Sequence, residues 1–248
     1  MQCRVHLVPA ASATTETLAA HIASLNACSS VDGIIAQLPF PSHICRRTIL
    51  SDISPSKDVD GMHPLNVAAA FDSAEAPFIP CTALGVRILL DQYGISTAGK
   101  HAVVVGRGPI AGRSIAVALG HSDATVTICH KQTQNLGAIT SSAELLVSAT
   151  GCASLITPRH VRPGAVVIDV GAAFDASGRL VGDVESQVAE VAGAITPVPG
   201  GVGPMTVVGL LLNTFTAYTR NNNVNRYVDS LRFCSLRRGG AFTSLQKQ

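Results

Sequence analysis

The chain has 248 residues and a mass of 25.6 kDa, and 47% of its residues are hydrophobic while 14% are charged. This composition excludes a disordered chain, a coiled coil and a collagen-like repeat. The formal net charge is +2, but residues 220–248 hold six Lys or Arg against one Asp, so residues 1–219 are mildly acidic, with twelve basic against fifteen acidic residues. A body of that charge argues against a protein that coats nucleic-acid phosphates.

The seven cysteines indicate reduced thiols in an intracellular protein, because their number is odd and no C-x-x-C pair occurs. No metal site is expected, since Cys129 and His130 have no further ligands at suitable spacing. Residues 191–219 carry no charge, but prolines and glycines interrupt them, so no membrane span is expected. We expect a cytoplasmic protein, or a mitochondrial one if a targeting segment precedes Met1.

A helix and a buried strand are expected first along the chain. Leu18, Ile22 and Leu25 recur at helical spacing and predict a helix over residues 14–26. The apolar run 31–37 predicts a buried strand, which stops at a proline-rich stretch.

A short helix over residues 43–50 and a polar loop over residues 54–61 are expected next. Thr82 is a good N-cap, so a further helix is expected from there to Gly94.

From about residue 96 the pattern changes to alternating strands and helices. Four apolar runs predict strands at residues 102–106, 125–129, 145–150 and 165–170. This alternation is typical of parallel βαβ units, so we expect an α/β fold with a parallel sheet. The polar tail from Asn221 shows little periodicity and is expected to be loosely held.

A glycine-rich turn follows the first of these strands. Gly106, Gly108 and Gly112 lie in the spacing G-x-G-x-x-x-G, one residue longer than the common dinucleotide fingerprint. Glycine lets the backbone approach a pyrophosphate, and a helix N-terminus offers N–H donors and a positive dipole end. The turn predicts a dinucleotide site, with a tight structural turn as the alternative.

The end of the second strand selects the cofactor. It reads Cys129-His130-Lys131, without the carboxylate that usually accepts from the ribose hydroxyls of NAD. Arg107 and Lys131 can instead meet an extra phosphate. The sequence therefore predicts NADP.

Four further stretches combine rigidity with polar groups. Gln37-Leu38-Pro39 ends the predicted strand, and Lys57–Gly61 is a loop for which a solvated turn is the alternative. Pro80-Cys81-Thr82 begins a helix. Pro197–Thr206 is too rich in proline and glycine for an ordinary linker, and would let two backbone turns close over a flat ligand.

In this order and spacing, these stretches resemble the bifunctional methylenetetrahydrofolate dehydrogenase/methenyltetrahydrofolate cyclohydrolase family. The resemblance covers about residues 4–219 and rests on six blocks: Asp32–Pro39, Lys57–Asn66, Ile79–Thr82, Gly99–Gly112, Ala124–His130 and Pro197–Thr206. It implies two domains with a cleft between them. The implied parts are an α/β folate-side domain over residues 1–94 that is N-terminally incomplete, a Rossmann-type NADP-binding domain over 95–195, a loop and helix returning to the first domain over 196–219, and a basic tail over 220–248.

The resemblance implies NADP-dependent oxidation of 5,10-methylenetetrahydrofolate to 5,10-methenyltetrahydrofolate and its hydrolysis to 10-formyltetrahydrofolate. A hydride passes from the methylene carbon to the nicotinamide, and water then adds to the methenyl cation. The implied partners are tetrahydrofolate substrates and a second copy of the chain, in a homodimer formed through the Rossmann domain. Neither a nucleic acid nor a membrane is expected as a partner.

The same resemblance assigns residues to the site. Gln37 and Asp60 are the expected catalytic residues, with Gln37 positioning a lysine and the substrate. The pterin presents two parallel N–H donors, and the Asp60 carboxylate can accept both. The expected substrate-binding residues are Gln37, Leu38, Pro39, Asp60, Pro199, Gly200, Gly201 and Pro204. The expected NADP-binding residues are Gly106, Arg107, Gly108, Ile110, Gly112, His130, Lys131, Thr150 and Gly151.

One family motif, Tyr-x-x-x-Lys on the first long helix, does not occur in these 248 residues, and its lysine is the family's main catalytic group. Residues 4–9 resemble the strand that follows that helix. Two interpretations stay open: Met1 is internal to a longer, active enzyme, or the chain is a non-catalytic relative that binds NADP or folate. A weaker alternative is an NADP-dependent dehydrogenase of another amine-like substrate, which has no use for Asp60 together with Pro197–Thr206. For these residues alone we expect near-absent cyclohydrolase activity and dehydrogenase activity that is weak at best.

Overall fold

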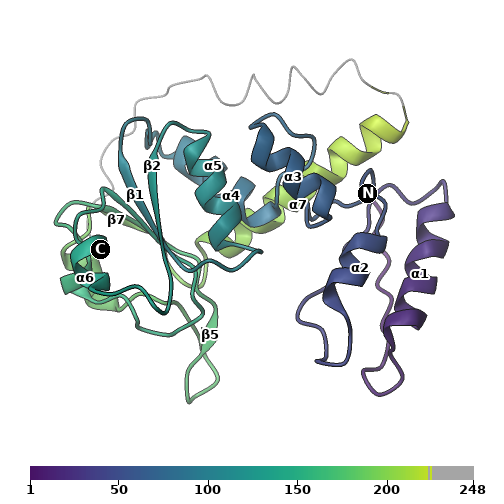
Figure 1. Ribbon diagram of the computed structural model, residues 1–248, viewed down its shortest axis with the longest axis horizontal. Helices are drawn as coiled ribbons and strands as arrows, with labels where there is room; N and C mark the ends of the chain where they lie inside the picture. Colours follow the sequence, from purple (N-terminus) through teal and green to yellow (C-terminus); the bar gives the residue numbers. More distant parts are fainter. Residues whose placement is uncertain (223, 225–248) are drawn as a thin grey trace.

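The computed structural model describes residues 1–222 and 224, so most of the tail expected beyond Asn221 lies outside the described residues. The helices are α1 (Thr15–Ala27), α2 (Arg46–Asp52), α3 (Pro64–Asp72), α4 (Cys81–Gln92), α5 (Gly112–Gly120), α6 (Leu136–Thr140) and α7 (Val202–Asn221) (Figure 1). The strands are β1 (His101–Val105), β2 (Thr125–Cys129), β3 (Leu145–Ser148), β4 (Val166–Asp169), β5 (Ala173–Phe174), β6 (Leu180–Val181) and β7 (Ala194–Ile195). Two short 3₁₀ helices span Pro158–His160 and Ser186–Glu190.

Five parallel strands form the main sheet, in the order β2-β1-β3-β4-β7. Alternate residues of β1 reach opposite faces: Val104 joins a core with residues of α4 and α5, whereas Val103 and Val105 join a second core on the other face. Strands β1, β3 and β4 are largely buried on both faces, and such strands have nearly continuous apolar sequences, which made them evident beforehand. The edge strand β2 is partly exposed and was evident from its β-branched residues. The predicted α/β class with a parallel sheet is confirmed.

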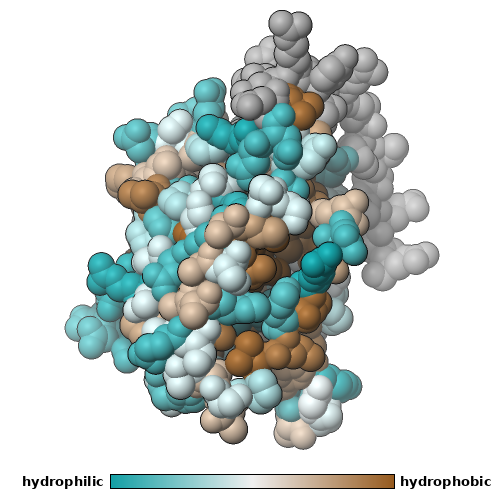
Figure 2. Space-filling view, turned by 90° about the vertical axis from the view of Figure 1, so that its right-hand side faces the viewer, coloured by the Kyte–Doolittle hydropathy of each residue, from teal (hydrophilic) through white to brown (hydrophobic). Residues whose placement is uncertain are grey.

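The first 92 residues contain four helices and, within the described chain, no strand. The strand predicted over 31–37 is wrong: Ile34 forms an isolated bridge to Asp58, and Ile35 is 46% exposed. A strand is defined by its neighbours, and in the described residues only one residue of this run has such a partner. Residues 4–9, likened to a strand above, form none either, and Val5 and Leu7 are exposed. Figure 2 shows apolar groups among polar ones on the side of the molecule that carries α1 and α2.

The helices α3 and α4 differ from the sequence predictions, and a proline lies at the start of each helix. The helix α4 begins at Cys81 with Pro80 as its N-cap, so Thr82 lies inside the helix rather than capping it. The helix α3 was not predicted, although Pro64 at its first position and the ring of His63, which accepts from Leu65 N at 3.1 Å, fix its start.

The helix α7 leaves the sheet and packs on α4 (Figure 1). It begins at Val202, so the second half of the glycine–proline stretch is helix and not loop. Pro204 is tolerated there because the first turn of a helix has no intrahelical N–H bonds to lose. No described helix, including this one, is long and apolar enough to span a bilayer.

Candidate active site

A hollow of about 240 Å³ lies at the carboxyl ends of the parallel strands. It opens where the strand order reverses, between β1 and β3, the place where parallel sheets usually bind nucleotides. Of the residues expected to bind NADP, it is lined by Gly108, Ile110, Gly112, Thr150 and Gly151. It is also lined by Pro109, Ala111, Ala149, Val170 and Ala172, which were not predicted. Val170 and Ala172 follow β4, and the carboxyl ends of parallel strands share one edge of the sheet. The sequence could therefore have predicted them as part of the site.

The ends of β1 and β2 lie side by side, but the expected NADP-binding residues Gly106, Arg107, His130 and Lys131 are not among those that line the hollow. Val105 pairs with Cys129, and Gly106 N donates to Cys129 O at 2.9 Å. Arg107 and Lys131 each stand two residues beyond that pair, and both are exposed. Two cations therefore follow adjacent strand ends, as the NADP prediction requires.

His130 forms part of the turn after β2. Its backbone N–H donates to Thr133 Oγ1 at 2.9 Å, and its ring Nδ1 accepts from Gln132 N at 3.3 Å. The histidine thus fixes the turn that presents Lys131.

Asp60 lies partly buried in the loop between α2 and α3. Burial raises the pKa of its carboxyl, a hydrogen bond from the Cys81 thiol opposes that rise, and the Asp58 charge adds to it. Burial also raises the pKa of the Cys81 thiol, which lies 3.2 Å from Val59 O. The thiol therefore stays neutral and donates to Val59 O, next to the Asp60 carboxyl.

Asn213 of α7 joins this loop to the start of α4. Its side chain is 1% exposed, and its Nδ2 donates to Val59 O at 3.0 Å and to Ile79 O at 2.9 Å. Gly209, one turn earlier, permits the close approach, because a Cβ there would lie 2.7 Å from Cys81 O. Sequence reasoning missed Asn213, since its partners stand 154 and 134 residues away.

Asn213→Ala is expected to lower the free energy of unfolding by about 1–3 kcal/mol, because the partly buried Ile79 carbonyl loses its donor and the buried Val59 carbonyl loses one of two. Thermal or urea unfolding measures this. The control is Asn221→Ala on the same helix, whose exposed side chain donates to Asp32 O at 3.4 Å and should matter by less than about 0.5 kcal/mol. Equal losses in the two variants would contradict the role assigned to Asn213.

The loop that carries Asp60 is not a solvated turn. Asp58 is 1% exposed, and its Oδ2 accepts from His63 N and Asn66 Nδ2, both at 2.8 Å. Lys57 Nζ donates to carbonyls at the end of α1, including Asn26 O at 2.8 Å. These two charged residues hold the loop in place.

Gln37 is exposed, and its Nε2 donates to Leu38 O at 3.0 Å. Ile34 N donates to Lys57 O at 2.7 Å, so the run that ends in Gln37 starts beside the loop that carries Asp60. Within the described chain no hydrogen bond joins Gln37 to Asp60.

The glycine–proline stretch leads directly into α7. Pro199 and Gly200 are exposed, Gly201 is buried as the N-cap, and Pro204 lies in the first helical turn. Asn213 follows about three turns later. One helix therefore connects this stretch with the Asp60 loop. Over the described range, no group of three or more His, Cys, Asp or Glu is placed to hold a metal ion.

Two family models match the chain. The catalytic-domain model of tetrahydrofolate dehydrogenase/cyclohydrolase matches residues 1–60, and the NAD(P)-binding-domain model of the same family matches residues 80–222. The chain belongs to this family. The family predicted from the six sequence blocks is confirmed.

Members of the tetrahydrofolate dehydrogenase/cyclohydrolase family from several organisms are close in sequence. The bifunctional protein FolD of Hydrogenobaculum sp. is 49% identical over 205 residues, covering 82% of this chain and 73% of the relative. That of Thermus thermophilus is 52% identical over 202 residues, covering 82% of this chain and 71% of the relative.

Solved structures of two proteins with these activities in their names have folds similar to that of this chain. The crystal structure of FolD from Campylobacter jejuni has a TM-score of 0.81 at 46% identity and covers 84% of this chain and 75% of its own. The Trypanosoma brucei methylenetetrahydrofolate dehydrogenase-cyclohydrolase, solved with NADP and an inhibitor, has a TM-score of 0.81 at 41% identity and covers 87% of this chain and 75% of its own.

Proposed function

We propose that this protein oxidises 5,10-methylenetetrahydrofolate with NADP and hydrolyses the resulting 5,10-methenyltetrahydrofolate to 10-formyltetrahydrofolate. The observation that carries the proposal is the match of both domain models of one bifunctional family to a single chain. The hollow at the edge of the sheet supports it, because it lies where a dinucleotide would.

The residues around the hollow fit NADP. The loop after β1 leads into α5, and Ala111, the N-cap, forms no side-chain cap, so a phosphate can approach the positive end of the helix. Arg107 and Lys131 supply positive charge for a 2′-phosphate. When bound, NADP accepts the hydride. The chain itself contributes the position and the charge of the site.

Asp60 would hold the pterin. Its ionised carboxyl accepts both parallel N–H donors, and the Cys81 thiol and the Asn213 amide keep its loop in one place. Pro199 and Gly200, exposed before α7, supply a flat backbone surface for the ring. Gln37 is exposed and free to reorient toward the substrate.

The test is an assay of NADPH formation with 5,10-methylenetetrahydrofolate and either NADP or NAD, paired with NADPH binding followed by fluorescence. For these 248 residues alone we expect saturable NADPH binding, and substrate-dependent reduction that prefers NADP but is weak at best. Disappearance of added methenyltetrahydrofolate reports the hydrolytic step. Absence of both turnover and cofactor binding contradicts the proposal.

A cytoplasmic location is proposed from the cysteines. All six cysteines in the described part of the chain are free, and four of them are exposed. Exposed free thiols are typical of proteins in reducing compartments.

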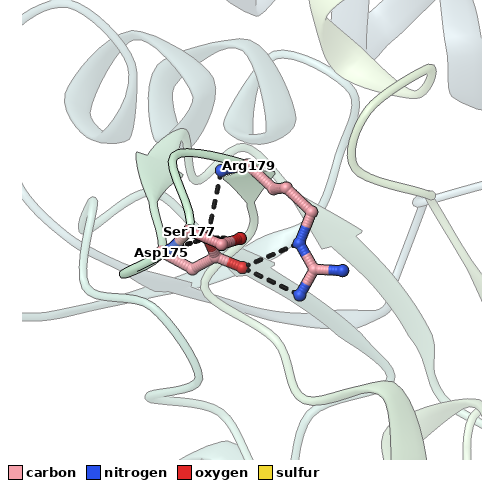
Figure 3. Close-up of polar contacts among 3 residues, drawn as sticks. All are labelled: Asp175, Ser177 and Arg179. Atoms are coloured by element: carbon pink, nitrogen blue, oxygen red, sulfur yellow. Dashed lines mark hydrogen bonds and ion pairs between the residues drawn. The ribbon is translucent and has the colours of Figure 1, made fainter.

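We also propose a homodimer that uses the hairpin of β5 and β6, which projects from the sheet (Figure 1). Phe174 on this hairpin is 75% exposed, a position that a partner would cover. The turn is rigid: Asp175 accepts from Ser177 Oγ at 2.6 Å and from Arg179 Nε at 3.1 Å (Figure 3).

Phe174→Asp is expected to convert the dimer into a monomer, because a charge would have to be buried in the interface. Analytical ultracentrifugation measures the change. Phe71→Asp is the matched control, since Phe71 is 71% exposed but belongs to α3 and not to the hairpin. A Phe174→Asp variant that remains dimeric would rule out the hairpin interface.

A further inference from the structure

Asp183, just after β6, lies under the hollow rather than in it. Its side chain is fully buried, at 0% exposure. Its Oδ2 accepts three hydrogen bonds, from Ser148 Oγ at 2.8 Å, Thr150 N at 2.7 Å and Thr150 Oγ1 at 2.8 Å. All three donors belong to the end of β3 and the turn that follows it. One carboxylate therefore fixes a turn about 33 residues earlier in the chain.

A second buried carboxylate holds Asp183 itself. Asp169, at the end of β4, accepts from Asp183 N through Oδ1 and from Val184 N through Oδ2, both at 3.0 Å. A side chain at Gly182 would overlap the Asp169 carboxylate and come within 2.9 Å of Val198. The backbone around Asp183 is thus fixed between β4 and the stretch that leads into α7.

The turn that Asp183 holds is one wall of the hollow. Thr150 and Gly151 line the hollow, and Thr150 has both its N–H and its hydroxyl turned inward to Asp183. The hydroxyl also accepts from Cys152 N at 3.1 Å, which closes the turn. With these groups engaged below, the wall presents backbone to a ligand, and a nucleotide can lie close against it.

We propose that Asp183 is a positioning residue for the dinucleotide: it fixes the Thr150–Gly151 wall against which the cofactor binds. This rests on the proposed use of the hollow for NADP. Asp183 makes no contact with the cofactor, being fully buried, and acts through Thr150.

The proposal separates Asp183 from the residues that read the 2′-phosphate. Arg107 and Lys131 stand after β1 and β2, whereas Thr150 follows β3 on the other side of β1 in the sheet. If the Thr150–Gly151 wall is no longer fixed, the affinities for NADP and for NAD should therefore fall by the same factor. Loss of general stability would not produce an affinity change at temperatures where the protein stays folded.

The experiment is titration of the purified protein with NADPH and NADH, followed by fluorescence, at a temperature where circular dichroism shows each variant folded. Asp183→Ala should raise both dissociation constants about tenfold or more, because three donors lose a charged acceptor. Asp183→Asn keeps one carbonyl oxygen with two lone pairs, so it should recover part of the affinity. Ser148→Ala removes one donor that lies outside the hollow, and should raise both dissociation constants only a few-fold.

Asp58→Ala is the matched control, because Asp58 is also a buried carboxylate, 1% exposed, but holds a loop of the other unit. It should lower the melting temperature without changing the NADPH dissociation constant. If Asp183→Ala does not fold, the dissociation constants of Asp183→Asn and Ser148→Ala test the proposal instead.

The inference is overturned if the variants at Asp183 and Ser148 bind both cofactors as tightly as the parent. It is also overturned if Asp58→Ala loses as much cofactor affinity as Asp183→Ala. A change confined to NADPH also overturns it. If the parent protein binds neither cofactor, the proposed function fails first, and the positioning role fails with it.

Discussion

Asp60→Ala is expected to weaken binding of a folate analogue by about 2–3 kcal/mol, roughly 30- to 150-fold. The pterin's two N–H donors would lose their acceptor in a partly buried place. Asp60→Asn should bind little better, since its NH₂ group would face one of those donors. Calorimetric titration with the analogue measures both. Asp72→Ala, at an exposed aspartate that ends α3, is the control and should leave the affinity unchanged.

The same titration repeated across pH tests the charge state. Burial raises the pKa of Asp60, and only the ionised form accepts from both donors. As the pH falls, the affinity should therefore begin to drop above the ordinary carboxyl range, about pH 3.9. An Asp60→Ala variant that binds as tightly as the parent, or an affinity that ignores pH until well below that range, would remove Asp60 from the site.

Arg107→Ala is expected to reduce the affinity for NADP about ten- to hundred-fold and to leave that for NAD nearly unchanged. The variant loses charge-assisted hydrogen bonds to the 2′-phosphate, which NAD lacks, and such bonds contribute about 1.5–3 kcal/mol. Lys131→Ala should have the same sign and a smaller effect, because a lysine meets the phosphate as a point charge. Fluorescence titration with NADPH and NADH gives the ratio directly.

Arg162→Ala controls for the lost charge, since Arg162 is exposed in the same unit but away from the glycine loop. It should leave the ratio unchanged. Equal affinities of the parent protein for the two cofactors would refute the selection of NADP by Arg107 and Lys131, whatever the variants do.

The two halves of the chain differed in how far their sequence predicted their structure. The run Thr125–Cys129 became β2 with the predicted ends, although it lies at the edge of the sheet and is partly exposed, because its β-branched residues favour a strand and β1 pairs with it. The run 31–37 is equally apolar, yet it forms a single bridge at Ile34. Hydrophobicity indicates burial, whereas a strand also needs a partner, and the partner is not encoded in the run itself.

The sequence by itself determined the family, the α/β class and the glycine loop, since each is read from short stretches of neighbouring residues and their order along the chain. Tertiary structure alone decided which buried polar groups hold the site: Asn213 across to Val59, and Asp183 across to Thr150. A lone asparagine or aspartate in an apolar stretch carries no periodicity that reveals its partner. Its role becomes visible only in the folded chain, where Asn213 Nδ2 and Asp183 Oδ2 meet their partners.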